Sequence, residues 1–191
     1  MNEIIEILGK VEENENSAFF YTPYKYGLEK CYLFGKPSKT LVCDNQESII
    51  DKLSEVDDLI KKYKYGYGYI TYEAGYALEE KLFPLQQISD SKLLAFNFYE
   101  KKDVKIIPSE EITFKKSSSL LNLMTFAIKE IKLSQTKDEY EANINEIRRL
   151  ISLGDTYQVN YTLKSKFNFE GSISLFAAAL VFNQSAQYTA F

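Results

Sequence analysis

The chain has 191 residues, of which 45% are hydrophobic and 26% charged, and its formal net charge is −4. This composition is that of a globular protein and excludes intrinsic disorder. The sequence contains no histidine, which excludes a Ser-His-Asp triad, a Cys-His dyad and an imidazole zinc ligand within these residues. The negative balance argues against a nucleic-acid partner, because neutralising phosphates requires surplus Lys and Arg.

The cysteine content and the N-terminus predict a cytoplasmic protein. Cys31 and Cys43 are the only cysteines, and their spacing matches neither a redox pair nor a metal site. The N-terminus carries acidic residues early and lacks a long apolar core, so it does not resemble a signal peptide. The longest apolar stretch, 173–182, is far short of the roughly 20 residues that span a bilayer. We therefore expect no membrane partner.

The first part of the chain is expected to form a loop, short strands and a helix. Residues 12–16 are polar and indicate a solvated loop, whereas 19–43 hold aromatic runs divided by Pro and Gly, which is typical of several short strands. From Asp44 the apolar spacing becomes helical, with Asp44 or Asn45 as the cap. The apolar residues of this helix share one face: Ile49, Leu53, Val56 and Ile60.

The segment 63–72 alternates strictly and predicts a strand, with Gly66 and Gly68 on one face leaving room for a close neighbour. Its tyrosines suit either a ligand-stacking surface or core packing, and core packing is the favoured interpretation. Downstream, we expect a short helix or turn at 73–83, strands at 93–99 and 104–107, a surface connection at 108–119, and either strand or helix at 120–133.

The clearest unit runs from 136 to 167. Thr136 and Glu139 form a capping box at a helix start, and Gly154 suits the position just past its end. The helix presents an apolar face made of Tyr140, Ile144, Ile147 and Ile151. Residues 156–167 then alternate and predict a strand.

After Gly171 we expect a buried helix over 173–182 and a starting strand at 187–191. Since the chain stops inside this segment, we expect a truncated domain. Strands and helices without regular βαβ alternation predict an α+β fold with largely antiparallel sheets flanked by helices.

Two groups of polar side chains are candidates for chemistry. Glu73, Glu79 and Glu80 follow the tyrosine strand, but solvent-facing charges are the favoured interpretation, because nothing pairs them. Gln158, Asn160 and Thr162 share one face of the predicted strand 156–167. They suit either the orientation of a ligand with carboxylate or hydroxyl groups, or a solvated face, and the pattern leaves both open.

The unit 137–167 and the segment after it resemble the chorismate-utilising enzymes. In that family an E-Y-x-x-x-I-x-x-I-x-x-x-I-x-x-G-D helix leads into a Y-Q-V-N-[LY]-[ST] strand. The matching residues here are Glu139, Tyr140, Ile144, Ile147, Ile151, Gly154, Asp155 and Tyr157 to Thr162. An N-x-S-P-Y-x-A-F segment follows, here 183–191, with Gln187 where the family has Pro. More weakly, 31–43 is similar to S-Y-L-F-x-x-P and 68–79 to G-Y-[IL]-S-Y-E-A-G-Y.

The resemblance is closest to the branch of aminodeoxychorismate (para-aminobenzoate) synthase component I, with anthranilate synthase component I as a relative. It implies a parent enzyme that aminates chorismate to 4-amino-4-deoxychorismate in folate biosynthesis. It also implies a glutamine amidotransferase partner that supplies ammonia, and Mg²⁺ in the parent enzyme. The alternatives are an anthranilate synthase component I fragment and a non-catalytic module that binds an aromatic amino acid or another subunit.

The same resemblance implies that this chain is the N-terminal portion of the anthranilate-synthase-component-I-like fold. Family members are much longer, and their P-x-x-K-G-T and S-P-E-R motifs do not occur here. We therefore assign no catalytic and no metal-binding residue to these 191 residues and expect no turnover by the chain alone. We expect an N-terminal α+β region at 1–133 and the start of the chorismate-binding region at 134–191.

One family feature can be placed on this sequence. The resemblance implies a pocket for an aromatic amino acid, built from an L-L-x-S segment and the S-P-Y-x segment. Thr22, at the end of FFYT, stands at the serine position, and Tyr188 and Thr189 supply the second wall.

Overall fold

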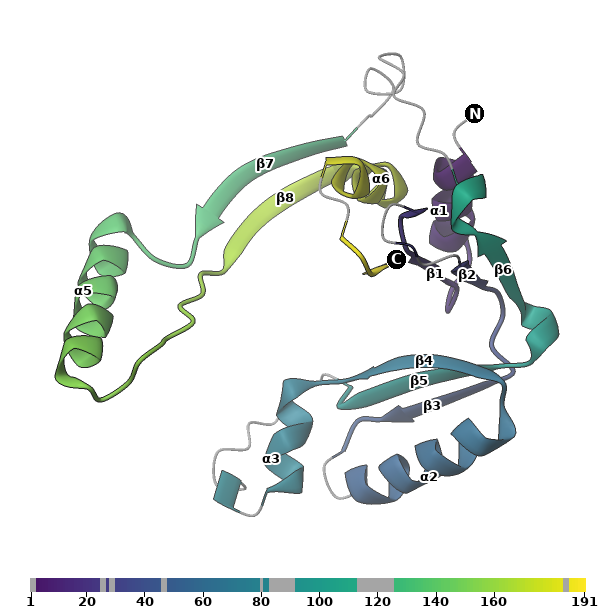
Figure 1. Cartoon of the computed structure of the whole chain (residues 1–191), viewed down its shortest axis with the longest axis horizontal. Coiled ribbons are helices and arrows are strands. Elements are labelled where there is room, and N and C mark those ends of the chain that lie inside the picture. The colour runs from purple at the N-terminus through teal and green to yellow at the C-terminus, as the bar shows by residue number, and fades with distance from the viewer. Residues whose placement is uncertain are drawn as a thin grey trace. The chain divides into compact units, whose positions relative to one another are not determined.

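The computed structural model describes residues 3–24, 27, 30–45, 48–79, 81–82, 92–112, 126–183 and 186–191. They form two compact units, Met1–Ser118 with Ser174–Phe191, and Ser119–Ile173. The fold is α+β with antiparallel sheets, which confirms the predicted class (Figure 1). The predicted division between 133 and 134 was drawn from motifs and stays a prediction.

The first unit contains a four-stranded antiparallel sheet in the order β6-β2-β1-β9. Its strands are β1 (Ala18–Tyr21), β2 (Lys30–Phe34), β6 (Val104–Pro108) and β9 (Thr189–Ala190). The helices α1 (Glu3–Glu13) and α6 (Ile173–Asn183) contribute to the hydrophobic core on one face of this sheet. The core brings together Ile4, Leu8, Phe19, Cys31, Ile107 and Ala178. The predicted short strands and the helix after Gly171 are therefore confirmed.

Helix α1 corrects the prediction of a loop at 12–16. Ile4, Ile7, Leu8 and Val11 are buried at the i, i+3, i+4 and i+7 spacing of a helix face. Residues 12 and 13 are the last turn of this helix, and only 14–17 form the connection to β1. The polar run was misleading, because the end of an amphipathic helix and a loop are both solvated.

The second sheet of the first unit has the order β3-β5-β4. It is formed by β3 (Lys39–Cys43), β4 (Tyr65–Ile70) and β5 (Leu94–Tyr99), and α2 (Ile49–Lys62) packs on it (Figure 1). The strand predicted at 63–72 is confirmed over β4. A side chain at Gly68 would overlap the Ala95 carbonyl oxygen and lie 2.5 Å from Phe96 Cγ. The predicted room for a close neighbour is thus occupied by β5.

Helix α2 confirms the helical spacing of apolar residues predicted from Ile49 onward, but its apolar face is only partly buried. Ile49 and Val56 are buried, whereas Ile60 is 58% exposed. The helix starts one turn later than the predicted caps imply, with Ser48 as the N-cap residue. Asn45 still contributes, because its Oδ1 accepts hydrogen bonds from the Ser48 backbone N–H (2.9 Å) and hydroxyl (2.7 Å).

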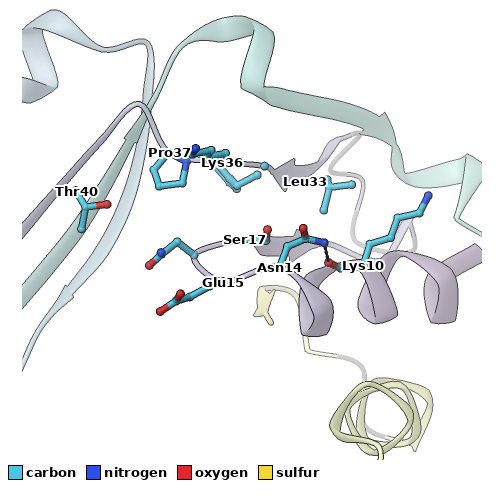
Figure 2. Close-up of a pocket in the computed structure, with 11 residues that line it drawn as sticks. Lys10, Asn14, Glu15, Ser17, Leu33, Lys36, Pro37 and Thr40 are labelled. Carbon is cyan, nitrogen blue, oxygen red and sulfur yellow. Dashed lines mark hydrogen bonds between the residues drawn. The ribbon is translucent and has the colours of Figure 1, made fainter.

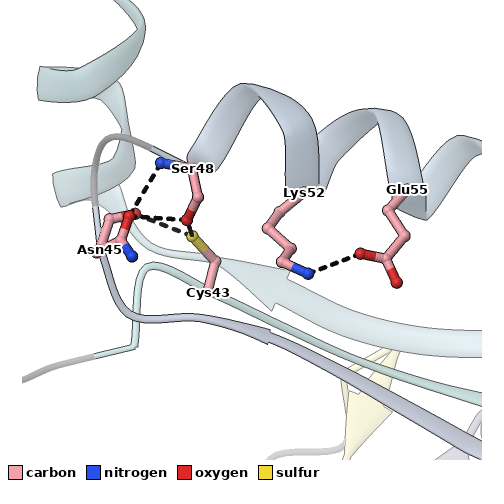
Figure 3. A network of polar contacts seen from close by, with 5 residues as sticks. All are labelled: Cys43, Asn45, Ser48, Lys52 and Glu55. Atoms are coloured by element: carbon pink, nitrogen blue, oxygen red, sulfur yellow. Dashed lines mark hydrogen bonds and ion pairs between the residues drawn. The ribbon is translucent and has the colours of Figure 1, made fainter.

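Figure 3 shows how this helix start joins the preceding strand. The buried Cys43 thiol donates to the Asn45 carbonyl oxygen at 3.0 Å and lies 3.5 Å from the Ser48 hydroxyl. One turn along the helix, Lys52 and Glu55 form an ion pair at 2.7 Å. The hydrogen bond to Glu55 raises the pKa of Lys52. The contacts of Cys43, Asn45 and Ser48 fasten the start of α2 to the end of β3, whereas the Lys52–Glu55 pair lies within the helix.

An aromatic cluster joins the two sheets of the first unit. Phe34 from β2 lies with its ring centroid 5.0 Å from those of Tyr67 on β4 and Tyr99 on β5. Phe20 packs against both Phe34 (5.3 Å) and Tyr67 (5.4 Å). The strand tyrosines therefore pack between sheets, which is the interpretation favoured from the sequence.

The predictions for 73–107 in this unit are confirmed where the structure describes them. The predicted strands at 93–99 and 104–107 are β5 and β6. The 3-10 helix η2 (Tyr72–Ala74) begins one residue before the predicted run at 73–83, and α3 (Gly75–Leu78) lies within it. Residues 80 and 83 lie outside the described residues.

Two further 3-10 helices, η4 (Lys101–Asp103) and η5 (Ser109–Glu111), flank β6. The surface connection predicted at 108–119 is wrong over 108–112, because Pro108 ends β6 and Ser109 and Ile112 are buried against the core of the first sheet. Residues 113–119 lie outside the described part.

The second unit consists of an antiparallel strand pair and one helix. Strand β7 (Phe126–Leu133) pairs with β8 (Ser165–Gly171), and α5 (Lys137–Leu153) lies between them in sequence. This settles the open choice at 120–133 as strand from 126 onward. The capping box of Thr136 and Glu139 is present, and Gly154 ends the helix with φ of 81°. Both predicted helix boundaries are confirmed.

The strand predicted over 156–167 is wrong for its first nine residues, because β8 begins only at Ser165. Residues 157–164 follow α5 back to the strand pair and form no strand pairing. The Tyr161 ring packs on Tyr140 of α5 at 5.7 Å, and Asn143 Nδ2 donates to the Tyr161 hydroxyl at 2.8 Å. The alternation is real, but contact with the helix takes the place of a partner strand.

Candidate functional site

The pairing of β1 with β9 brings the predicted pocket residues together. Tyr21 lies opposite Thr189, and Phe20 lies opposite Ala190. Phe19 and Phe191 exchange both backbone hydrogen bonds, at 2.7 and 2.9 Å. Continuing the same antiparallel register places Thr22 and Tyr188 at adjacent ends of the two strands. The structure thus joins two segments that the sequence separates by most of its length.

Thr22 belongs to a buried polar cluster. Its backbone N–H donates to Cys31 Sγ at 3.5 Å, and the thiol donates back to the Thr22 carbonyl at 3.6 Å. The Ser109 hydroxyl lies 3.6 Å from the same sulfur. Burial, and secondarily the Cys31 thiol, raises the pKa of the neighbouring Tyr21. The cluster supplies hydrogen-bond partners to this buried end of β1.

The two walls of the predicted pocket differ in their access to solvent. Thr22 is only 8% exposed, whereas Tyr188 is 72% exposed. An aromatic ligand would therefore contact the solvent-exposed Tyr188 side chain on one side and the buried end of β1 at Thr22 on the other. The role of Thr22, Tyr188 and Thr189 in binding stays a prediction.

Gln158 and Asn160 are exposed and lie on the segment that follows α5. Gln158 Nε2 donates to Asn160 Oδ1 at 3.3 Å, so the two side chains do share one side of the chain. The Thr156 hydroxyl donates to the Gln158 carbonyl at 3.1 Å. Their place in a ligand site stays a prediction, and the strand that was expected to present them is absent.

A cleft of about 670 Å³ lies at the opposite end of β1 from Thr22 (Figure 2). One lip is the connection from α1 to β1, with Asn14, Glu15 and Ser17, and the other is the turn from β2 to β3, with Lys36 and Pro37. The complete lining is Lys10, Asn14, Glu15, Asn16, Ser17, Leu33, Phe34, Gly35, Lys36, Pro37 and Thr40.

Hydrogen bonds to residues of β4, β5 and η4 hold both lips of this cleft. Asn16 has φ of 62°, and its carbonyl accepts from the Tyr99 hydroxyl at 2.8 Å and the Tyr67 hydroxyl at 3.0 Å. On the other lip, the Gly35 N–H donates to the Asp103 carbonyl (3.0 Å) and the Ser38 N–H to the Phe98 carbonyl (2.9 Å). The cleft is therefore preformed by the fold.

Sequence reasoning missed this cleft. Its residues come from a polar loop and a Gly-Lys-Pro turn, which were interpreted only as connections. One usable signal was present, because Asn tolerates positive φ and marks tight turns. The partners that hold Asn16 are more than fifty positions downstream, at Tyr67 and Tyr99, and no local pattern reveals them.

Within the described residues, no three Cys, Asp or Glu side chains gather to hold a metal ion. Glu73 and Glu79 are exposed, and Glu80 lies outside the described part. The presence of Mg²⁺ in the parent enzyme stays a prediction. In the same part of the chain, no helix is long and apolar enough to cross a membrane. The cytoplasmic location stays a prediction.

Comparison with known proteins adds one finding. The sequence model of a protein family described as chorismate binding enzyme matches residues 17–191. The match begins next to β1, omits α1 and extends through the second unit to β9. Neither a curated protein nor a solved structure matches the chain.

Proposed function

From the premise that this chain belongs to the chorismate binding enzyme family, we propose that it is the N-terminal portion of an aminodeoxychorismate synthase component I. The parent enzyme would aminate chorismate to 4-amino-4-deoxychorismate for para-aminobenzoate and folate biosynthesis. The observation that carries this proposal is the family match over 17–191. The Y-Q-V-N-Y-T spelling at 157–162 favours this branch over anthranilate synthase.

The proposal includes a division of labour within the parent enzyme. The described residues supply a scaffold of two sheets and a helix unit, and no three Cys, Asp or Glu side chains among them gather to hold a metal ion. Catalytic groups, magnesium and the contact with a glutamine amidotransferase would come from other parts of the assembly. The chain would thus serve as a structural part of the parent enzyme, and the catalytic side chains would lie elsewhere in the assembly.

Two assays test this proposal. The purified chain, incubated with chorismate, Mg²⁺ and ammonia, is expected to form neither aminodeoxychorismate nor anthranilate. The parent enzyme with its amidotransferase is expected to form aminodeoxychorismate, identified by mass spectrometry against authentic standards. Anthranilate as the product of the parent enzyme would overturn the branch assignment, and turnover by the chain alone would overturn the division of labour.

A second candidate function is the binding of an aromatic amino acid, and the β1–β9 pairing favours it by bringing Thr22 beside Tyr188. Calorimetric titration of the chain with tryptophan tests it. A saturable signal should be lost in Tyr188→Ala and kept in Tyr157→Ala, a matched change at a tyrosine that is 94% exposed in the other unit. No heat and no thermal shift at millimolar tryptophan would count against the pocket.

A further inference from the structure

The second unit buries none of its described residues, and its helix α5 has an apolar face without a cover. At the two ends of that face Tyr140 is 40% and Ile151 is 41% exposed. Ile144 and Ile147, between them, are only partly buried. Helices in proteins owe most of their stability to the burial of such a face. The surface formed by these four side chains, which we call the α5 face, is therefore a candidate docking surface.

The two sides of the α5 face differ. On one side Asn143 donates to the Tyr161 hydroxyl at 2.8 Å, and the Tyr161 ring packs on Tyr140, so Tyr161 covers this side. On the other side lie Glu141 and Arg148, which are both exposed. Because they are seven positions apart, close to two turns of a helix, both charges flank the same side of the α5 face.

The order of these two charges selects the direction of a partner helix. Glu141 lies in the N-terminal half of α5 and Arg148 in its C-terminal half. When a second α5 packs antiparallel, with Ile144 of one copy opposite Ile147 of the other, Glu141 of each copy lies beside Arg148 of the other. A parallel pair would place both charges beside uncharged residues and would align the two helix macrodipoles unfavourably. The surface is therefore complementary to a second copy of itself in the antiparallel direction.

The strand pair of the same unit is less suited to self-association. Among the described strands, β7 and β8 pair only with each other, so each has a free edge. Lys129, Lys132 and Lys166 lie on these strands, and the register is interrupted between Lys129 and Lys132. Lysines and bulges on edge strands disfavour pairing with another chain. The α5 face carries no charge of its own and is the better surface for a second copy.

We infer that two copies of this chain pair through α5 in an antiparallel arrangement with two-fold symmetry. Tyr140 of one copy packs near Ile151 of the other, and two Glu141–Arg148 ion pairs flank the contact. A helix of 17 residues is roughly 25 Å long, so the interface is small and the dimer dissociates on dilution. The inference depends on α5 alone, and it holds whichever reaction the parent enzyme catalyses.

Sedimentation velocity on the 191-residue chain tests the pairing. Between roughly 5 and 500 µM, the sedimentation coefficient should rise from the value of a monomer to that of a dimer and no further, because a two-fold contact closes after two copies. A chain that stays monomeric over this range would overturn the inference and would leave the α5 face to another part of the parent enzyme. Growth beyond a dimer would overturn it as well.

A substitution in the middle of the contact tests the surface. Ile147→Asp places a charge on the α5 face and should keep the chain monomeric over the same range. Ile60→Asp is the matched control, since Ile60 is an isoleucine on α2 that is 58% exposed, and it should leave the dimer unchanged. Circular dichroism checks that both variants retain their helices. A dimer that persists in Ile147→Asp, or one that is lost equally in the control, would overturn the assignment of the surface.

Charge exchange tests the direction of the pairing. Glu141→Arg and Arg148→Glu should each weaken dimerisation by roughly five- to tenfold, because each variant places like charges beside one another twice. Mixed in equal amounts, the two variants should associate with each other at least as tightly as the parent chain, since every flanking pair then has opposite charges. This rescue distinguishes lost pairing from lost folding. A mixture that associates no better than the separate variants would overturn the antiparallel arrangement.

Discussion

The Tyr99 hydroxyl donates to the Asn16 carbonyl oxygen at 2.8 Å, across 83 positions of sequence. Tyr99 is fully buried, and the Tyr67 hydroxyl donates to the same oxygen at 3.0 Å. Asn16 is one of two non-glycine residues with positive φ among those described. The two phenols satisfy a carbonyl that the left-handed turn would otherwise leave without a protein partner, and they hold one lip of the cleft.

Tyr99→Phe should lower the free energy of unfolding by about 1 kcal/mol, the usual net contribution of one buried hydrogen bond. Tyr67→Phe should cost less, because its hydroxyl is more exposed and water replaces part of the bond. Urea denaturation of both variants checks this, with Tyr69→Phe as a control at a residue that is 51% exposed. A larger loss in Tyr67→Phe than in Tyr99→Phe would contradict this ranking.

The stability of the first unit should decline in alkali, in part because of Tyr99. Burial raises the pKa of Tyr99 well above its usual value, with a further contribution from the hydrogen bond with Tyr67. In the unfolded chain this phenol loses its proton near pH 10, while the folded chain retains it. Stability is therefore fully present below about pH 10 and falls as the pH rises further.

Tyr99→Phe removes that contribution, so its urea midpoint should fall less between about pH 9 and 11 than that of the parent chain. Tyr69→Phe should follow the parent chain over the same range. A parallel decline in all three proteins would show that Tyr99 does not contribute to the alkaline loss.

The loss of stability on replacing the β4 glycines with alanine should depend on the space available for the added Cβ atom. A Cβ at Gly68 would overlap the Ala95 carbonyl and the Phe96 ring, whereas at Gly66 the nearest atom is Phe98 Cδ1 at 3.1 Å. Gly68→Ala should cost about 2–3 kcal/mol through overpacking, and Gly66→Ala clearly less. Gly75→Ala is the matched control, since nothing lies within 4 Å of its Cβ position. Equal losses at 66 and 68, measured by urea denaturation, would contradict the close packing of β4 on β5.

The capping box of α5 should make the second unit sensitive to acid. The Thr136 backbone N–H, and secondarily its hydroxyl, lowers the pKa of Glu139 by hydrogen bonding. A carboxyl with a lowered folded pKa stabilises above its unfolded value near 4.3 and loses this effect as the pH falls. Hydrogen exchange of the first-turn amides of α5 should therefore quicken toward low pH beyond the intrinsic change.

Two variants separate charge from hydrogen bonding at this cap. Glu139→Gln retains a side chain that can reach the Thr136 N–H, so it should keep much of the protection but lose its pH dependence. Thr136→Ala should lose protection at every pH. Unchanged protection in Thr136→Ala would mean that the box does not hold the helix start.

The sequence alone determined the elements whose signals are local. Helices α2 and α5 follow from apolar spacing, and the ends of α5 follow from Thr136, Glu139 and Gly154, because a helix makes its contacts three and four residues apart. The glycine face of β4 is also a local signal, because residues two apart on a strand share one face. The specific Y-Q-V-N-Y-T run pointed to the chorismate-utilising family, which the match over 17–191 confirms.

Only the tertiary structure decided which segments are neighbours. It paired β1 with β9 and so brought Thr22 to Tyr188, it tied Asn16 to Tyr67 and Tyr99, and it laid 157–164 along α5 rather than in a sheet. An alternating segment becomes a strand only when a partner edge satisfies its backbone groups. That partner is chosen by long-range packing, which local residue patterns do not contain.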